Sequence, residues 1–250
     1  MDPPSQVTPP VRGPRTVALV GIDGSGKTTQ AHLLADELSA LGLPASYRRN
    51  AGGRRWFGRL ATALGRRDGE DLLGRRGMLV VESLLRWLAI LRTLLRRAVT
   101  GEIAVMDRYA VCQYASLRAH GAGPAAERRA RLAYRLFPKP DVTFLLAVDP
   151  AVAYDRVESR GYDHEEIGYL RAAAAAYRAL PEYPDFVVID ANRTPAEVLA
   201  SLRAELAAYL PDAPRRRRLT PRSNFRVLIL ALGSLTAGVS ALGNRLAEVL

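Results

Sequence analysis

A loop of eight residues near the amino terminus limits what this chain can fold into more than any other feature. The loop, Gly21–Thr28, matches the pattern G-x-x-x-x-G-K-S/T. The continuous apolar run Val17–Val20 precedes it and is typical of a strand buried on both faces. From Lys27 onward, apolar residues recur at helical spacing until Gly42. The sequence therefore predicts a strand, a glycine turn and a helix in direct succession.

This succession predicts a phosphate-binding unit. Glycines let successive backbone N–H groups turn inward around phosphates, and the helix N-terminus adds positive partial charge. We expect Lys27 to reach the β- and γ-phosphates of ATP and the Thr28 hydroxyl to bind Mg²⁺. The alternative is a glycine-rich turn that holds no ligand. The residues expected to contact the nucleotide are Gly21, Gly24, Ser25, Gly26, Lys27, Thr28 and Thr29.

Apolar runs and helical stretches alternate along the rest of the chain. Such alternation predicts an α/β fold, here a P-loop NTPase-type three-layer α/β/α sandwich with a five-stranded parallel sheet. The expected strands are Val17–Val20, Ala45–Arg48, Ile103–Asp107, Val142–Val148 and Phe186–Asp190. After the helix that starts at Lys27, the expected helices are Met78–Ala98, Ala125–Phe137, Ala151–Ser159, Gly168–Leu180 and Pro195–Leu210.

Composition divides the chain into four segments. Residues 1–14 are polar and proline-rich and are expected to be flexible, whereas residues 15–210 are expected to form the P-loop domain. Residues 211–226 contain prolines and four consecutive arginines, which predict a linker. Residues 227–250 are expected to form an apolar C-terminal helix, so that the chain ends in a basic and apolar extension.

The net charge of +11 comes from 36 basic and 25 acidic residues, and 34 of the basic residues are arginines. This bias is more typical of codon usage than of a particular partner. No known nucleic-acid motif interleaves with the arginines, so we expect no nucleic-acid partner. One of the two lysines is Lys27, whose compact ammonium suits a small phosphate cradle better than a planar guanidinium. The single cysteine, Cys112, and the polar start predict a cytoplasmic protein.

The C-terminal segment has three open interpretations. Residues 227–243 carry no charge and, as a helix, would extend about 25 Å, which is short of a hydrocarbon core. The arginines before them favour contact with anionic lipid, so residues 215–243 are one candidate for a membrane-surface contact and for membrane association. The alternatives are docking on the folded domain or on a second subunit, as in a homodimer, and a disordered extension.

Motifs over residues 16–210 resemble the thymidylate kinase family of P-loop nucleoside monophosphate kinases. An aspartate at the position of Asp23, inside the loop, is typical of that family. The resemblance implies that its carboxylate lies near the metal and the acceptor phosphate.

A second motif follows the strand predicted at Ile103–Asp107. Asp107, Arg108 and Tyr109 resemble the family's Asp-Arg-Tyr motif and lie at the edge where open α/β sheets bind ligands. The resemblance implies that Arg108 contacts the acceptor phosphate and the transferred group. Asp107 would then support Mg²⁺ or its waters, and Tyr109 would belong to the same acceptor site. The alternative is a structural ion pair at a strand end.

Two further stretches carry candidate arginines. The segment Tyr47–Gly53 resembles the family's Arg-Glu-Pro-Gly-Gly segment with the glutamate and proline replaced, which aligns Arg49 with an arginine that binds the acceptor phosphate. Arg156 and Arg160 resemble the pre-lid and lid arginines that hold the donor nucleotide, and their spacing predicts one helix face. A lid at residues 160–166 would exclude water. In each case the alternative is a solvated arginine.

The base-reading positions depart from the family pattern. The residues after Tyr109 offer Gln113 to pair with a base edge, and the preceding long helix offers Arg86 as a base reader. The predicted activity is transfer of the γ-phosphoryl group of MgATP to a small nucleotide substrate, dTMP or a related nucleoside monophosphate. The expected catalytic residues are Lys27, Arg108, Asp23 and Arg160. The alternatives are a membrane-tethered regulatory P-loop protein without kinase activity, and a kinase for another small acceptor.

Overall fold

The computed structural model describes residues 14–50, 65, 69–161 and 165–210 of the 250-residue chain. The predicted linker and apolar helix, residues 211–250, lie outside the described residues, as do residues 1–13 of the predicted flexible segment. Within the described ranges, no helix combines the length and the apolar character needed to cross a membrane.

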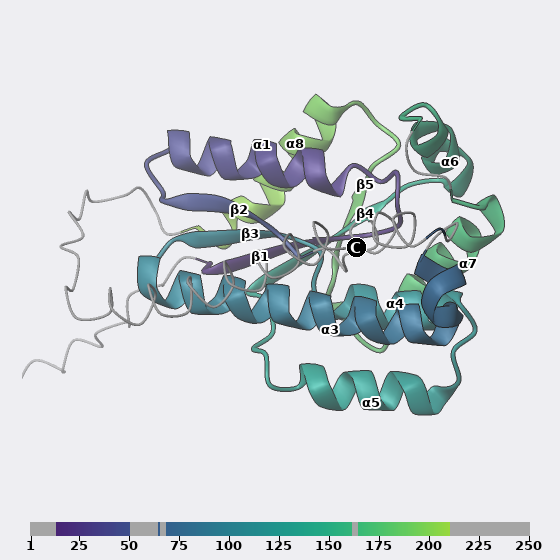
Figure 1. Ribbon diagram of the computed structural model, residues 1–250. Helices are drawn as coiled ribbons and strands as arrows, with labels where there is room; N and C mark the ends of the chain where they lie inside the picture. Colours follow the sequence, from purple (N-terminus) through teal and green to yellow (C-terminus); the bar gives the residue numbers. More distant parts are fainter. Residues whose placement is uncertain (1–13, 51–64, 66–68, 162–164, 211–250) are drawn as a thin grey trace, which may run out of the picture. The chain divides into compact units, whose positions relative to one another are not determined.

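Five parallel strands form one sheet in the order β2-β3-β1-β4-β5, which confirms the predicted sheet (Figure 1). Every residue of β1 and β3 is buried, because both strands lie inside the sheet and are covered on both faces. In register, Asp107 at the end of β3 lies beside Leu19 of β1 and Arg49 of β2, so three strands end at one edge. The strands are β1 Thr16–Val20, β2 Ala45–Arg49, β3 Ile103–Asp107, β4 Val142–Ala147 and β5 Val187–Asp190.

Helices cover both faces of the sheet, as predicted for a three-layer α/β/α sandwich. One layer consists of α1 and α8, which pack against each other; the other contains α3, α4 and α7, with α5 packed on α4 (Figure 1). The short helix α6 packs on α7. The helices are α1 Lys27–Ala40, α3 Gly69–Thr100, α4 Ala110–Ala119, α5 Pro124–Tyr134, α6 Pro150–Glu158, α7 Ile167–Arg178 and α8 Pro195–Ala207, with a 3₁₀ turn η1 at Tyr183–Asp185.

The predicted apolar stripe of the first helix is confirmed except at Leu41, which caps the helix and is 53% exposed. Ala31, Leu34, Ala35 and Leu38 are all at most 3% exposed and belong to the main hydrophobic core. Burying a leucine side chain stabilises the fold by about 1.5–3 kcal/mol. This packing fixes α1 against the sheet, and therefore fixes the glycine loop that joins β1 to α1.

One helix was missed, and the bounds of others differ from the predicted ones; α5 and α8, for example, end at Tyr134 and Ala207 rather than at Phe137 and Leu210. Helix α4 was not predicted, because its first eight residues are all buried and show no amphipathic stripe. Helix α3 begins at Gly69 rather than Met78, with a kink at Gly74 where φ is 67°. Helix α6 ends at Glu158, and Gly161 follows in a turn with φ of 70°. A left-handed glycine of this kind is typical just beyond a helix end.

Candidate active site

The glycine loop after β1 approaches two neighbouring segments so closely that side chains have no room. A Cβ on Gly24, where φ is 82°, would lie 2.3 Å from the carbonyl oxygen of Ala153 in α6. A Cβ on Gly21, where φ is 144°, would lie 2.7 Å from the carbonyl oxygen of Leu146 in β4. Gly26 precedes α1 with φ of 88°. Conformation and packing both require glycine at positions 21 and 24, and conformation alone favours it at position 26. The loop keeps its backbone N–H groups available for phosphate.

Lys27 begins α1 and is only 4% exposed. Its ammonium donates a hydrogen bond to the carbonyl oxygen of Ile22 at 2.5 Å and lies 3.6 Å from Oδ1 of Asp23. Burial lowers the pKa of Lys27, and the neighbouring Arg108 lowers it further, whereas Asp23 and Asp107 raise it. The protein thus keeps a cation in a place where burial disfavours it, which is typical of a group held for an anionic ligand.

Asp107 ends β3, and its carboxylate faces the start of α1. Its Oδ2 accepts hydrogen bonds from the Thr28 hydroxyl at 2.6 Å and from the Tyr47 hydroxyl at 3.2 Å. Burial, followed by the charge of Asp107, raises the pKa of Tyr47 to about 12, so the phenol stays a donor. Among the described residues nothing donates to Oδ1 of Asp107, although that oxygen is buried. A hydroxyl beside a buried carboxylate oxygen without a donor is a donor set that fits Mg²⁺.

Arg108 follows Asp107 in an unusual backbone conformation. Its φ is 81°, the one positive value outside glycine in the described part of the chain. The guanidinium forms an ion pair with Oδ1 of Asp23 from the glycine loop. Burial alone would lower the pKa of Arg108, but Asp23 and Asp107 raise it well above its ordinary value, so the side chain stays charged. Two cations and two carboxylates therefore meet where β1 and β3 end.

Most of the folded domain matches one protein family. The sequence model of the thymidylate kinase family matches residues 19–202. The chain belongs to the thymidylate kinase family. A thymidylate kinase from Leifsonia xyli subsp. xyli is 33% identical over 213 residues, which cover 76% of this chain and 93% of that one. A protein named "probable thymidylate kinase" from Pyrobaculum aerophilum is 31% identical over 192 residues, covering 76% and 94%, and one from Archaeoglobus fulgidus is 29% identical over 196 residues, covering 78% and 95%.

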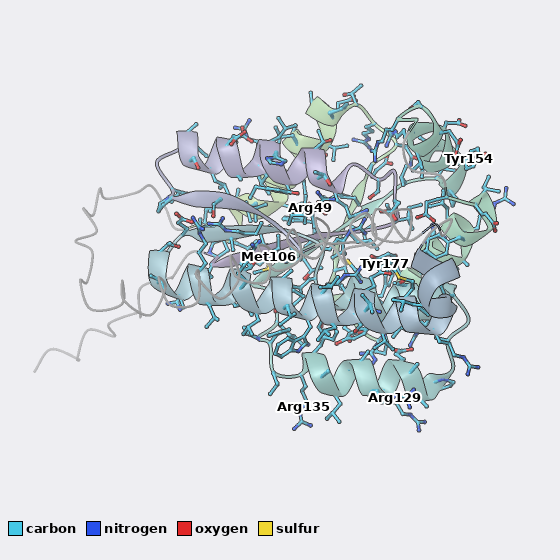
Figure 2. The ribbon with its side chains drawn as sticks, in the orientation of Figure 1. Arg49, Met106, Arg129, Arg135, Tyr154 and Tyr177 are labelled. Carbon is cyan, nitrogen blue, oxygen red and sulfur yellow. The ribbon has the colours of Figure 1, made fainter. Side chains whose placement is uncertain are left out.

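Family membership confirms the predicted resemblance, in which Arg49 aligns with an arginine that binds the acceptor phosphate. Arg49 is the last residue of β2, is exposed, and lies in register beside Asp107 (Figure 2). The preceding Arg48 instead pairs with Glu102 at 2.9 Å, which makes Arg48 structural. The glycines that follow in the predicted segment, residues 52 and 53, lie outside the described residues.

The two predicted base readers lie together between α3 and α4. Arg86 donates hydrogen bonds to Oε1 of Gln113 at 2.8 Å and to Oε1 of Glu82 at 2.7 Å. All three residues are at most 7% exposed. Because Arg86 donates to the oxygen of the Gln113 amide, the amide nitrogen is left as a donor, and it has no acceptor among the described residues. The pairing of Arg86 with Gln113 was not visible in the sequence.

Tyr109 lies at the N-cap of α4 and is 5% exposed. Its hydroxyl donates a hydrogen bond to the carbonyl oxygen of Pro138 at 2.5 Å, and burial raises its pKa above the ordinary value. This hydroxyl is engaged within the fold. The predicted contact of Tyr109 with the acceptor therefore has no support from the position of its polar atom.

The two predicted donor-side arginines differ in setting. Arg156 in α6 donates hydrogen bonds to the carbonyl oxygens of Ala191 at 2.8 Å and Asn192 at 3.4 Å, in the loop after β5. Arg160 is exposed and follows the end of α6 in a turn. The prediction that both lie on one helix face was therefore wrong, because the helix ends at Glu158. Residues 162–164 of the predicted lid lie outside the described residues.

A groove between α6 and the start of α7 borders the described part of the predicted lid. Its carboxylates would repel the phosphates of ATP, and neither Arg156 nor Arg160 is among the residues that line it. The residues that line the groove are Tyr154, Glu158, Glu165, Glu166, Ile167 and Gly168.

Proposed function

We propose that the protein transfers the γ-phosphoryl group of ATP to dTMP, giving ADP and dTDP. The observation that carries this proposal is the convergence of Lys27, Arg108 and two carboxylates at the ends of β1 and β3, in a chain that belongs to the thymidylate kinase family. Several relatives bear the name thymidylate kinase. An enzyme of nucleotide biosynthesis with this activity is expected in the cytoplasm.

The donor side of the site is built by the glycine loop and the start of α1. Backbone N–H groups of Gly21–Thr28 and the ammonium of Lys27 would hold the β- and γ-phosphates. Thr28 and Asp107 would hold Mg²⁺, which would neutralise part of the phosphate charge. Arg156, already placed beside the loop after β5, would contribute to the adenine end of the donor site.

The acceptor side is built by Asp23, Arg108 and Arg49. Transfer between two phosphates needs no strong base, because the acceptor is already an anion. Catalysis is then mainly alignment and electrostatic stabilisation of charge on the transferring group. Arg108 engages Asp23 of the glycine loop through one guanidinium nitrogen, which would leave its other N–H groups to bind the transferring phosphoryl group.

The acceptor base would be read by Gln113, positioned by Arg86. The amide nitrogen of Gln113 is a donor without an acceptor among the described residues, which suits a keto oxygen such as that of thymine. Where thymine has its 4-keto oxygen, cytosine has an amino group, which would face the Gln113 amide nitrogen with another donor. This arrangement supports dTMP as the acceptor over dCMP.

The proposal is tested by an acceptor panel with purified full-length protein. ADP formation from MgATP should depend on dTMP, with slower turnover of dUMP and little of dCMP, dAMP or dGMP. The Lys27→Ala variant is the control, and it should be inactive with every acceptor. Hydrolysis of ATP at the same rate with and without each monophosphate would contradict the proposal and favour a nucleotide-dependent regulator.

We further propose that two copies of the chain pair through α3. The outer face of this helix carries large apolar side chains at helical spacing, opposite the buried face that includes Arg86 and Ile90. A second copy would pack antiparallel across a two-fold axis, so that both copies contribute this same face. The exposed apolar residues of this face, all after the kink at Gly74, are Val80, Leu84, Leu88, Leu95 and Val99.

A further inference from the structure

Asn50, the residue after β2, is completely buried and makes hydrogen bonds with three of its polar groups. Its backbone N–H donates to the carbonyl oxygen of Asp107 at 3.0 Å. Its side-chain Nδ2 donates to the carbonyl oxygen of Arg108 at 3.0 Å, and its Oδ1 accepts from the hydroxyl of Thr93 in α3 at 3.0 Å. Thr93 itself is 2% exposed. Asn50 therefore joins β2, α3 and the end of β3 in one buried network.

This network contacts the backbone of Arg108, the residue of the site with the left-handed conformation. A left-handed conformation costs a residue with a side chain about 1–2 kcal/mol, and it persists only where the surroundings hold it. The peptide groups on both sides of Arg108 are held: its N–H donates to the carbonyl oxygen of Leu19 at 3.1 Å, and its carbonyl oxygen accepts from Asn50. With both peptide groups fixed, φ of 81° directs the side chain toward Asp23.

We infer that Asn50, held by Thr93, is a positioning residue that fixes the left-handed backbone of Arg108 and thereby aims its guanidinium at the transferring phosphoryl group. This inference rests on the proposed function. In this chain an amide serves both partners, because the side chain donates to the carbonyl oxygen of Arg108 and accepts from the hydroxyl of Thr93. The family segment that Tyr47–Gly53 resembles has a glutamate at the position of Asn50, and an ionised glutamate side chain has no hydrogen-bond donor.

The test compares three variants, one at Asn50 and two at Thr93, with a matched control. Asn50→Asp keeps the acceptor for Thr93 but removes the donor to Arg108, and it should lower kcat about 10- to 100-fold with little change in KM for MgATP. Thr93→Val removes the hydroxyl that donates to Asn50 and should lower kcat less, about 10-fold. Thr93→Ser keeps a hydroxyl, so its kcat should match that of the unsubstituted protein. The control is Thr16→Val, which removes the hydrogen bond of another buried threonine to Asp141, at 2.8 Å, at the start of β1. It should lower the melting temperature and leave kcat unchanged.

A double-mutant cycle separates positioning from general stability. In an Arg108→Ala background, Asn50→Asp should lower kcat less than about 2-fold further, because the group that it positions is gone. An equal loss of kcat in both backgrounds would overturn the inference.

A second measurement does not depend on turnover. The ¹³Cα and ¹³Cβ chemical shifts of Arg108 report its backbone conformation, and Asn50→Asp should move them away from left-handed values. Unchanged shifts would overturn the inference. If the unsubstituted protein phosphorylates no monophosphate, the proposed function fails, and the shifts still decide whether Asn50 holds Arg108.

Discussion

Two clusters of charged side chains in this fold differ in how fully their charged groups are hydrogen-bonded. In the network that links α4, α5 and the turn after α7, each carboxylate oxygen of Glu127 and Glu182 accepts from a guanidinium. At the ends of β1 and β3, Oδ1 of Asp107 is buried without a donor among the described residues, Arg108 is left-handed, and burial lowers the pKa of Lys27. The first cluster satisfies its own charges. The second holds groups that a bound nucleotide would satisfy better, which is typical of an active site.

The largest expected effect comes from removing the buried cation of the second cluster. Lys27→Met keeps most of the aliphatic stem and should lower kcat about 1,000-fold, since a preorganised donor to the transferring phosphate is lost. The melting temperature should stay the same or rise, because the folded protein no longer buries an ammonium whose pKa burial lowers. Steady-state kinetics and thermal unfolding of the same samples measure both. A loss of activity that follows a loss of stability would instead make Lys27 a structural residue.

The next effect tests the strain at Arg108. Arg108→Ala and Arg108→Gly should both lower kcat about 100-fold, since both remove the guanidinium. Their stabilities should differ: the glycine variant should be more stable by up to about 1 kcal/mol, because glycine adopts φ of 81° without strain.

The matched pair at Arg118, near the end of α4, should show the opposite order. There the backbone is helical, so Arg118→Gly should be less stable than Arg118→Ala by about 0.5–1 kcal/mol. Urea unfolding of the four variants gives the comparison. The same order at both positions would show that the left-handed conformation of Arg108 carries no strain.

The sequence predicted some features of the fold and of the second cluster and missed others. The glycine loop, Lys27 and the strand Ile103–Asp107 were predictable, because each depends on local spacing or on a continuous buried run. The role of Asn50 was not, since it depends on β2 lying beside β3 and on α3 passing over both. Helix α4 was missed because its burial on nearly all sides removes the periodicity that marks a surface helix.

A smaller effect, confined to stability, is expected in the first cluster. The hydrogen bond from Arg118 is the main cause that lowers the pKa of Glu127, and the pair with Arg131 lowers it further. Glu127→Gln should therefore destabilise the protein by about 1 kcal/mol at neutral pH and leave kcat unchanged.

The direction of the pKa shift of Glu127 determines how its contribution to stability changes with pH. A carboxylate with a lowered folded pKa contributes stability above its unfolded pKa, near 4.5, and loses that contribution as the pH falls through the folded pKa. The stability difference between Glu127→Gln and the unsubstituted protein should accordingly shrink on acidification below pH 4.5. A difference that stays constant to lower pH would show that Glu127 acts by packing rather than by charge.

The smallest effect on turnover is expected on the outer face of α3, whose inner face carries Arg86. Leu84 is 56% exposed and lies near the middle of the helix, where an antiparallel pair of copies would cross. Leu84→Glu should convert a dimer into a monomer, because the two-fold axis brings two introduced carboxylates together. Sedimentation equilibrium at several concentrations measures this, with Leu132→Glu, an exposed leucine of α5, as the control that should stay dimeric. If the unsubstituted protein is monomeric at every concentration, the apolar face of α3 does not pair with a second copy.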